Sequence, residues 1–271
     1  MAFLTEAEPP RGVAVAVLPG IRRITAGNVT PMTYWGTNTY LIDGPDGVTV
    51  LDPGPEDGGH VAAILAAAGR VGKILLSHTH HDHLGAVAGL KAATGAPVYG
   101  FERNPEPDFR PDVTLRDGDV VDGWTALHTP GHAPDHLAFA GDDGVVFSAD
   151  HVMGWSTSVV GPPNGDMGAY FASLRRLLGR RDRVFLPGHG PALEQPQAFV
   201  QAMLDHRLAR EAAIEAALRD RPRDSGGLVD ALYSQVNPVL RRAAERNVIA
   251  HLHKLRAEGR AVQEGLVWRV A

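Results

Sequence analysis

One short stretch of the chain carries most of its candidate chemistry: Ser77-His78-Thr79-His80-His81-Asp82-His83, in the pattern His-x-His-x-Asp-His. His78 and His80 lie two residues apart, so on an extended segment both imidazoles point to the same side and reach one ion. Asp82 and His83 follow where the chain turns, and they address a second ion nearby. Histidine nitrogen and carboxylate oxygen are ligands of zinc and its first-row neighbours. The spacing therefore predicts a metal site with places for two ions.

The elements on either side place this stretch at the end of a strand. Lys73 to Leu76 predicts a short buried strand, and Leu84 to Ala93 is small and apolar at helical spacing. Farther on, Val113 to Val121 and Trp124 to His128 are each expected to form a strand. Open α/β sheets bind ligands at the turns that follow the carboxyl ends of their strands. A histidine-rich turn that is merely polar is therefore the weaker interpretation.

The stretch resembles the signature of the metallo-β-lactamase superfamily, and four other segments resemble that family's remaining motifs in the same order. They are Leu51-Asp52-Pro53-Gly54, Thr129-Pro130-Gly131-His132, Phe147-Ser148-Ala149-Asp150 and Leu186-Pro187-Gly188-His189-Gly190. The resemblance spans residues 13–190. It implies an α/β fold, the four-layer αβ/βα sandwich, with metal ligands on loops at one edge of two sheets. It also implies a metal-dependent hydrolase.

The resemblance further implies a role for each ligand. Three histidines are expected to hold one metal, an aspartate and two histidines the other, and one aspartate to bridge them: His78, His80 and His132; Asp82, His83 and His189; and Asp150. The implied cofactors are two divalent ions per chain, expected to be zinc, that share a bridging hydroxide. Asp82 is the expected catalytic residue, which orients that hydroxide and carries its proton. Asp52 is expected to support the ligands without touching a metal.

Several residues near these motifs keep two interpretations. His136 follows His132 by four positions and is either a support of the ligands or a hydrogen-bonding partner of the substrate. Tyr34, Trp35 and Trp155 either wall the substrate cleft or pack within loops. The residue types alone do not separate these roles.

The composition limits the compartment and the partners. The 271 residues include no cysteine, which excludes disulfides and thiolate ligands. A net charge of −5 gives no overall attraction to nucleic acid or to an anionic membrane. The N-terminus has no basic, apolar leader, and no apolar run approaches about 20 residues. We therefore expect no signal peptide, no membrane span and a cytoplasmic protein.

The character of the sequence changes near residue 195, which predicts two domains. We expect a catalytic domain over residues 1–194 and a helical, winged-helix-like domain over residues 195–271. The second domain is expected to contain helices at about 196–218, 226–234 and 238–258 and a β-hairpin at 261–270. This tail resembles that of the β-lactamase-like branch whose animal members are mitochondrial endoribonucleases.

Charge is distributed unevenly between the two parts. Residues 1–205 carry 14 basic and 23 acidic side chains, net −9, whereas residues 206–271 carry 12 and 8, net +4. On the last expected helix, Arg242, Arg246 and Arg256 share one stripe, but Arg241 and Lys254 point elsewhere. Cations distributed in this way are typical of a solvated surface.

Two functions fit these features. The first is hydrolysis of a small-molecule ester, thioester or lactone by a metal-bridging hydroxide, with the tail closing the cleft. The alternative is a metal-dependent endonuclease that cleaves single-stranded RNA, with the tail guiding the strand. A binding protein with a vestigial site is disfavoured because all seven ligands are present. The first function is preferred because the catalytic part is acidic and lacks the stripe of basic and aromatic residues that single-strand binding uses.

Overall fold

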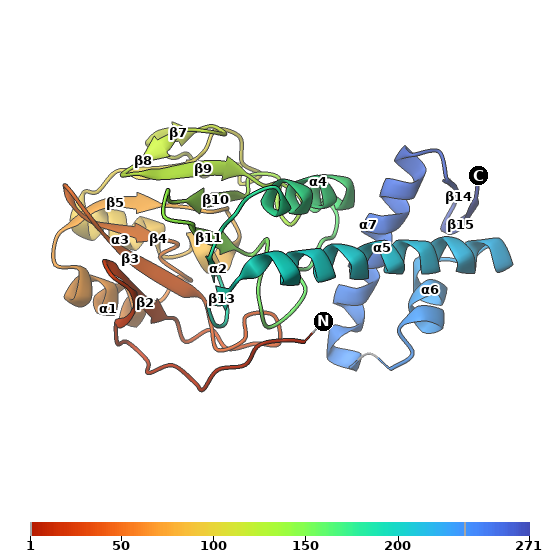
Figure 1. Ribbon diagram of the computed structural model, residues 1–271, viewed down its shortest axis with the longest axis horizontal. Coiled ribbons are helices and arrows are strands. Elements are labelled where there is room, and N and C mark those ends of the chain that lie inside the picture. The colour runs from red at the N-terminus through yellow and green to blue at the C-terminus, as the bar shows by residue number, and fades with distance from the viewer. Residues whose placement is uncertain (1, 236) are drawn as a thin grey trace.

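The computed structural model describes residues 2–235 and 237–271 and contains two large sheets that face each other (Figure 1). The first sheet has seven strands in the order in which they occur along the chain. They are β1 (Val15–Leu18), β2 (Ile21–Thr25), β3 (Asn38–Gly44), β4 (Gly47–Leu51), β5 (Val71–Leu75), β6 (Val98–Phe101) and β7 (Val113–Leu115). Neighbours pair antiparallel from β1 to β4 and parallel from β4 to β7.

The second sheet has six strands in the order β13-β12-β11-β10-β9-β8. They are β8 (Val120–Val121), β9 (Trp124–His128), β10 (Leu137–Ala140), β11 (Val145–Ala149), β12 (Val184–Pro187) and β13 (Leu193–Glu194). β11 and β12 are parallel, and the other neighbours are antiparallel. The carboxyl ends of β11 and β12 therefore meet at one edge of this sheet.

The single strand expected from Val113 to Val121 is wrong. The structure divides it into β7, in the first sheet, and β8, in the second. A tight turn separates them: the Asp119 carboxylate accepts the Arg116 backbone N–H at 2.7 Å, and Gly118 has a φ of +90°, which favours glycine. The chain passes from one sheet to the other at this turn.

Three apolar cores show the order of the layers. Leu51 and Leu75 of the first sheet pack with Phe139 of the second in the core between the sheets. On its outer face the first sheet packs against α1 (Gly58–Ala68) and α3 (Val87–Thr94). The second sheet packs against α4 (Met167–Leu178) and the first half of α5 (Pro196–Asp220). The catalytic part is thus a four-layer αβ/βα sandwich, as the sequence predicted.

The tail forms a smaller unit beside the sandwich (Figure 1). It contains α6 (Ser225–Leu232), the 3-10 turn η1 (Pro238–Leu240), α7 (Arg241–Ala257) and the hairpin of β14 (Ala261–Glu264) and β15 (Val267–Val270). Its core joins Ile214 and Leu218, from the second half of α5, to Leu252 of α7 and Trp268 of β15. α5 therefore contributes one half to each core and ties the two units together.

Several helices begin at an aspartate. Asp57, Asp166 and Asp224 accept backbone N–H bonds in the first turns of α1, α4 and α6, which satisfies donors that have no partner within the helix. None of the helices in the described ranges is long and apolar enough to cross a membrane.

Candidate metal centre

The His-x-His-x-Asp-His stretch follows β5, but the helix after it is interrupted. The stretch ends in the one-turn helix α2 (His81–Leu84), and two residues separate it from α3, so the continuous helix expected from Leu84 to Ala93 is wrong at its start. At Gly85, between the two helices, a Cβ atom would lie 2.5 Å from the backbone nitrogen of Glu56. This close backbone contact holds the short helix, and with it the ligands Asp82 and His83, against the turn after β4.

The other expected ligands come from the ends of three strands: His132 follows β9, Asp150 follows β11 and His189 follows β12. Glycines beside them allow a close approach. A Cβ atom on Gly188 would lie 2.3 Å from Oδ1 of Asp150, and one on Gly131 would lie 2.4 Å from Cα of Tyr170. Residues far apart in the sequence are thereby brought to one edge of the sandwich.

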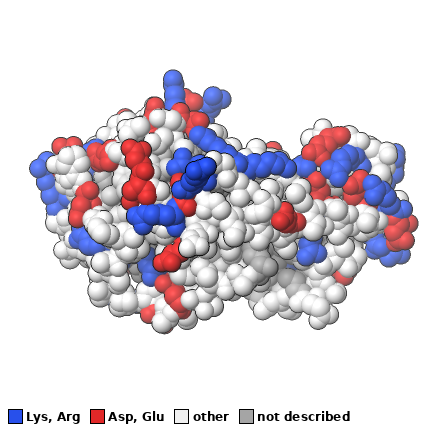
Figure 2. All heavy atoms as spheres, in the orientation of Figure 1, with Lys and Arg blue, Asp and Glu red and all other residues white. Residues whose placement is uncertain are grey.

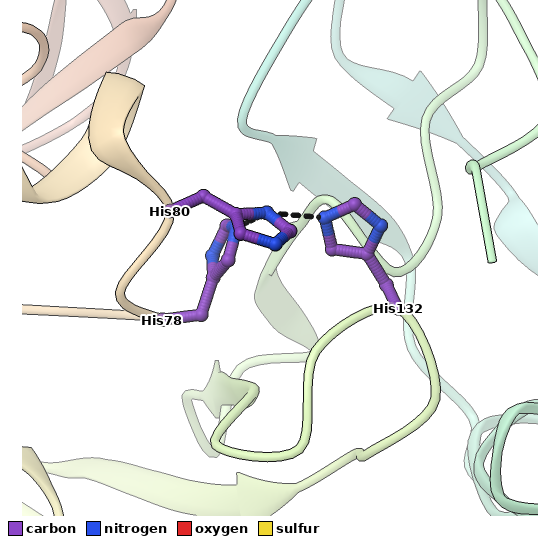
Figure 3. A group of neighbouring side chains, drawn as sticks. All are labelled: His78, His80 and His132. Atoms are coloured by element: carbon purple, nitrogen blue, oxygen red, sulfur yellow. Dashed lines mark hydrogen bonds between the residues drawn. The ribbon is translucent and has the colours of Figure 1, made fainter. Parts of the chain in front are cut away.

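Three histidines turn ring nitrogens toward one position (Figure 3). Nδ1 of His80 lies 2.9 Å from Nε2 of His78 and 2.9 Å from Nε2 of His132. The opposite nitrogen of His132 donates to the Val159 carbonyl at 2.7 Å, so its Nε2 carries a lone pair. The Ser77 hydroxyl donates its proton to the Asp52 carboxylate, so in its contact with Nδ1 of His78 it is the acceptor. Because Nδ1 of His78 carries the proton, Nε2 of His78 is an acceptor as well. One proton on His80 satisfies only one of these two acceptors.

A second group joins two histidines to two aspartates. Nε2 of His189 lies 3.2 Å from Oδ2 of Asp82 and 3.4 Å from Oδ2 of Asp150. Nε2 of His83 lies 3.4 Å from Oδ1 of Asp150. Asp150 also approaches the first group, since its Oδ2 is 3.6 Å from Nε2 of His132. Its carboxylate therefore lies between the two groups, where a bridging ligand would be.

Residues behind the ligands fix the ring orientations of the second group. The Asp52 carboxylate accepts hydrogen bonds from the Ser77 backbone N–H at 2.8 Å, the Ser77 hydroxyl at 2.6 Å and Nδ1 of His83 at 2.9 Å. Nδ1 of His189 donates to the Gly36 carbonyl at 3.2 Å. In the neutral form of each ring, which is the form that binds a metal, these bonds leave Nε2 as the acceptor. Asp52 thus lies behind the expected ligands and is hydrogen-bonded to one of them.

The whole arrangement has an excess of acceptor atoms. Its side chains form three overlapping sets whose ligand atoms lie within 4.8 Å of one another: His78, His80 and His132; His78, His83 and Asp150; and Asp82, His83 and His189. Nε2 of His83 and Oδ1 of Asp150 are buried and have no hydrogen-bond partner among the described residues. Such atoms are rare in folded proteins without a reason. Divalent cations would satisfy both groups, so the residues fit a metal centre.

The electrostatics of the two groups differ. Burial, and then the adjacent His132, lower the pKa of His80 to about 3. Burial also opposes the charged form of His189, but Asp150 and then Asp82 outweigh it and raise the pKa to about 9. Burial likewise lowers the pKa of His78, so the rings of His78 and His80 both present neutral nitrogens. In the second group a proton on His189 occupies the place of a cation, and a metal must displace it to bind.

His136 lies behind the metal ligands. It is fully buried, its ring centroid is 5.3 Å from that of His78, and its Nδ1 lies 2.9 Å from the Thr129 hydroxyl. It is absent from the lining of the cavity described next. Its ring therefore lies beside an expected ligand and outside the lining of the cavity.

A cavity of about 480 Å³ opens over the ligand atoms. Trp155 lines it, whereas Tyr34 and Trp35 do not. Tyr34 packs against Trp155 with ring centroids 5.0 Å apart, and the Trp35 ring N–H donates to the Glu6 carbonyl at 3.1 Å. Of the three aromatic residues, only Trp155 is placed to meet a substrate there.

The sequence predicts that the tail closes the cleft, but it does not identify the tail residues that line this cavity. The tail residues that line it are Tyr233, Leu240, Ala243, Ala244, Arg246 and Asn247. Four of them have the spacing i, i+3, i+4 and i+7 along η1 and α7, which places them on one helical face. This spacing can be recognised in the sequence and predicts that the four residues share a helical face. The sequence does not show which part of the protein that face packs against.

A short segment of the sandwich connects the metal ligands to the tail. Within Ser158–Val160, the Ser158 hydroxyl donates to the Asp150 carbonyl at 2.6 Å. On the other side, the Asn247 side-chain oxygen accepts the Val160 backbone N–H at 3.0 Å, and the buried Arg207 guanidinium donates to the Ser158 carbonyl and to Asn247. Bonds from α5 and α7 therefore reach residues that hold two ligands in place.

Two family profiles match the chain. The profile of the metallo-beta-lactamase superfamily matches residues 32–104 and 99–189. The profile of the beta-lactamase associated winged helix domain matches residues 225–268. The first match contains all seven expected ligands, and the second lies within the tail.

Individual relatives agree with these matches. The chain is 31% identical to the Beta-lactamase-like protein 2 homolog of Drosophila melanogaster, over 91% of this chain and 93% of that protein. It is 32% identical to the Atrochrysone carboxyl ACP thioesterase of Aspergillus chevalieri, over 81% and 72% of the two chains. The crystal structure of a beta-lactamase domain protein from Burkholderia ambifaria covers 98% of this chain and 96% of its own, with a TM-score of 0.85 and 21% identity. The last similarity bears on the fold alone.

Proposed function

The chain belongs to the metallo-beta-lactamase superfamily of metal-dependent hydrolases, and we propose that it hydrolyses a small-molecule thioester, ester or lactone at a centre of two zinc ions. The observation that carries this proposal is the excess of buried acceptor atoms at the floor of a cavity. Two cations would satisfy those atoms, and a cavity of about 480 Å³ above them has the size of a site for a small organic substrate.

The proposed ligands are the seven residues that the resemblance implies. One ion would be held by His78, His80 and His132, the other by Asp82, His83 and His189, with Asp150 between them. Imidazole and carboxylate ligands suit zinc, and the chain has no cysteine to offer a thiolate. The support of His83 by Asp52 and of His132 by the Val159 carbonyl is the arrangement that orients metal-binding imidazoles.

When bound, the two ions supply a water of lowered pKa and polarise the substrate carbonyl. The chain's own residues supply the rest. The Asp82 side chain is 29% exposed, against 9% for Asp150, so it is the carboxylate that can take up a proton and pass it to the leaving group. The Thr37 hydroxyl donates to Oδ2 of Asp82 at 3.4 Å and orients it. Trp155 and Met153 line the cavity and limit the entry of bulk water.

The charges of the tail favour a small molecule over RNA as substrate. A polyanion requires several free cations, and its binding weakens steeply with salt. Arg241 pairs with Asp230 at 2.7 Å, and Lys254 pairs with Glu211 at 2.8 Å. On the face drawn in Figure 2, acidic side chains lie beside basic ones over both the sandwich and the tail. The relative described by its name as a thioesterase supports the same choice.

The test combines metal analysis with a substrate panel. Protein purified without added metal is expected to contain about two divalent ions per chain, mostly zinc, by elemental analysis. The zinc-loaded protein is then assayed against acyl thioesters and single-stranded RNA, each at low and physiological salt. We expect thioester hydrolysis together with weak, salt-sensitive RNA binding.

Two results would contradict the proposal. One tightly held iron per chain, with no second ion, would overturn the dinuclear zinc centre. Robust RNA cleavage at physiological salt that is abolished by Asp82→Ala would show that the protein is an RNA endonuclease and not a small-molecule hydrolase.

A further inference from the structure

One guanidinium lines the cavity in addition to the metal ligands. Among the described lining residues, Arg246 is the only charged side chain that is not an expected ligand. It belongs to α7, so it reaches the cavity from the tail, whereas the ligands come from the sandwich. The cavity therefore has a metal-binding floor and a separate cationic position on another wall.

The guanidinium of Arg246 is held in place without being neutralised. Its Nη2 donates to the carbonyls of Gly161 and Pro162 at 3.4 and 3.2 Å. No carboxylate in the described part of the chain pairs with it, and its Nη1 and Nε have no hydrogen-bond partner there. Arg241, on the same helix, pairs with Asp230 instead. Arg246 is thus positioned by neutral groups, with its charge and further donors left for a ligand.

The backbone beside Arg246 accommodates this side chain closely. A Cβ atom on Gly161 would lie 2.6 Å from Cβ of Arg246 and 2.9 Å from its Nε. Any larger residue at this position would push the arginine away from the two carbonyls. A glycine here lets the side chain lie along the cavity wall.

The remaining wall around Arg246 is small and largely apolar. Leu240, Ala243 and Ala244 line the cavity from the same side of the tail. The Asn164 amide also lines it and makes no side-chain hydrogen bond within the described ranges. The polar atoms of Asn247, by contrast, are used by Val160, Arg207 and Ala243. Such a wall suits a short carbon chain that ends in one anionic group.

We propose that Arg246, assisted by Asn164, binds a carboxylate of the substrate at a distance from the bond that is hydrolysed. This inference rests on the proposed hydrolase function and specifies its substrate class as an anionic thioester or ester. A guanidinium fork matches a carboxylate in shape and charge. One free cation matches one carboxylate, whereas a nucleic acid strand would require a row of them. The carboxylate belongs either to the acyl group or to the leaving thiol.

The experiment compares substrates that differ in a single charge. One pair consists of glutaryl thioesters of N-acetylcysteamine with a free carboxylate or its methyl ester at the far end of the acyl chain. The other pair consists of butyryl thioesters of 3-mercaptopropionate and of its methyl ester. The zinc-loaded full chain and its Arg246→Gln, Arg246→Lys and Arg246→Glu variants are assayed for thiol release. Arg242→Gln is the matched control, because Arg242 is exposed one turn earlier on α7 and does not line the cavity.

We expect the native protein to favour the carboxylate member of one pair through a lower KM, and that pair identifies the part of the substrate that bears the charge. Arg246→Gln should reduce the ratio of kcat/KM values, carboxylate over methyl ester, by about 10- to 100-fold. Arg246→Lys should retain part of this ratio, and Arg246→Glu should invert it. Arg242→Gln should leave the ratio at its native value.

A binding measurement separates this inference from the function on which it rests. Calorimetry with the amide analogues, in which NH replaces the thioester sulfur, measures affinity without hydrolysis. Loss of carboxylate preference in Arg246→Gln by this measurement supports the site even if no thioester is hydrolysed. Thioester hydrolysis without any carboxylate preference, or with a preference that survives Arg246→Gln, overturns the site and leaves the hydrolase. A third result would also overturn the carboxylate site: binding of single-stranded RNA that is sensitive to salt and requires Arg246, without any preference for a carboxylate. Arg246 would then bind phosphate groups of the RNA.

Discussion

Two buried clusters in this protein contain histidine and carboxylate, yet they are completed in different ways. In the tail, Glu211 accepts hydrogen bonds from Lys254 at 2.8 Å, Arg260 at 3.1 Å and His251 at 3.2 Å. At the edge of the sandwich, Asp150 meets only the rings of neighbouring histidines. The tail cluster therefore contains lysine and arginine as permanent cations, whereas the carboxylates of the sandwich cluster face histidines, whose charge depends on pH.

The difference shows what identifies a metal centre. Burial opposes the charged form of Glu211, but His251 and Lys254 lower the pKa of this carboxyl to about 2. The cluster is a closed set of ion pairs and needs nothing further. The sandwich cluster has buried atoms without hydrogen-bond partners among the described residues, and in the metal-free protein a proton on His189 takes the place of a cation. The balance of donors and acceptors, and not the residue types, separates the two.

The largest effect is expected from Asp82→Ala. It removes a ligand and the carboxylate that carries the proton, but no side chain of the apolar cores. Hydrolysis should fall by about 10²- to 10⁴-fold while the melting temperature of the metal-free protein changes little. Asp43→Ala, which removes an exposed acid of β3, is the control. Hydrolysis close to the native rate in Asp82→Ala would show that its role is misassigned.

Glu211→Ala should affect stability and leave the metal centre intact. Removing this carboxylate leaves Lys254 and Arg260 around a buried position without its counter-charge, which costs about 3–5 kcal/mol of unfolding free energy. Chemical denaturation measures the loss, and elemental analysis should find the native zinc content. Glu264→Ala, in an exposed pair with Arg269, should cost less than about 1 kcal/mol. A loss of zinc in Glu211→Ala would mean that the two clusters are coupled.

The pH dependence of the metal-free protein should also distinguish the clusters. The pKa of His189 is raised from 6.5 to about 9, so the stabilising proton is fully present below pH 6.5 and is lost as the pH rises through 9. The unfolding free energy should fall by about 3 kcal/mol over this window. Glu211 contributes nothing there, because it stays ionised. Zinc should abolish this decrease in unfolding free energy. If the decrease persists with zinc bound, groups other than His189 cause it.

The smallest effect is expected from Asn247→Ala, which removes hydrogen bonds between the tail and the sandwich. It leaves the Val160 N–H and an N–H of Arg207 without their acceptor, at a cost of about 1–3 kcal/mol. Zinc affinity, measured by competition with a chelator, should fall by about tenfold because the neighbouring Val159 carbonyl orients His132. Gln201→Ala, exposed on α5, is the control. Unchanged zinc affinity would limit Asn247 to a structural role.

The sequence predicts the local part of the site well. His78, His80, Asp82 and His83 are close in the chain, so their spacing and the strand before them determine which side chains can meet. The other ligands come from the ends of strands, where apolar runs end at recognisable motifs. The winged-helix tail is likewise predicted from helical periodicity followed by a hairpin.

Relations between distant segments are not predictable in this way. Asp135 is buried and accepts the backbone N–H of Thr79 at 2.9 Å, across 56 residues, and no local pattern marks it. Arg246 shares a helical stripe with Arg242 and Arg256, yet only Arg246 faces the cavity, while Arg256 bonds to Gln263. The packing of α7 on the sandwich makes this distinction, and helix periodicity does not contain it.

The cavity is lined by residues of two separate units, the sandwich and the tail. This arrangement affects how the substrate range of such an enzyme can change during evolution. The residues expected to hold the metals belong to the sandwich, whereas Leu240, Ala243 and Ala244 belong to the tail and are not among those ligands. Mutations at these three positions can reshape the room for a substrate while the reactive centre is inherited unchanged. Selection can therefore explore new substrates with a low risk of losing activity. A directed-evolution library aimed at a new specificity would begin on this wall.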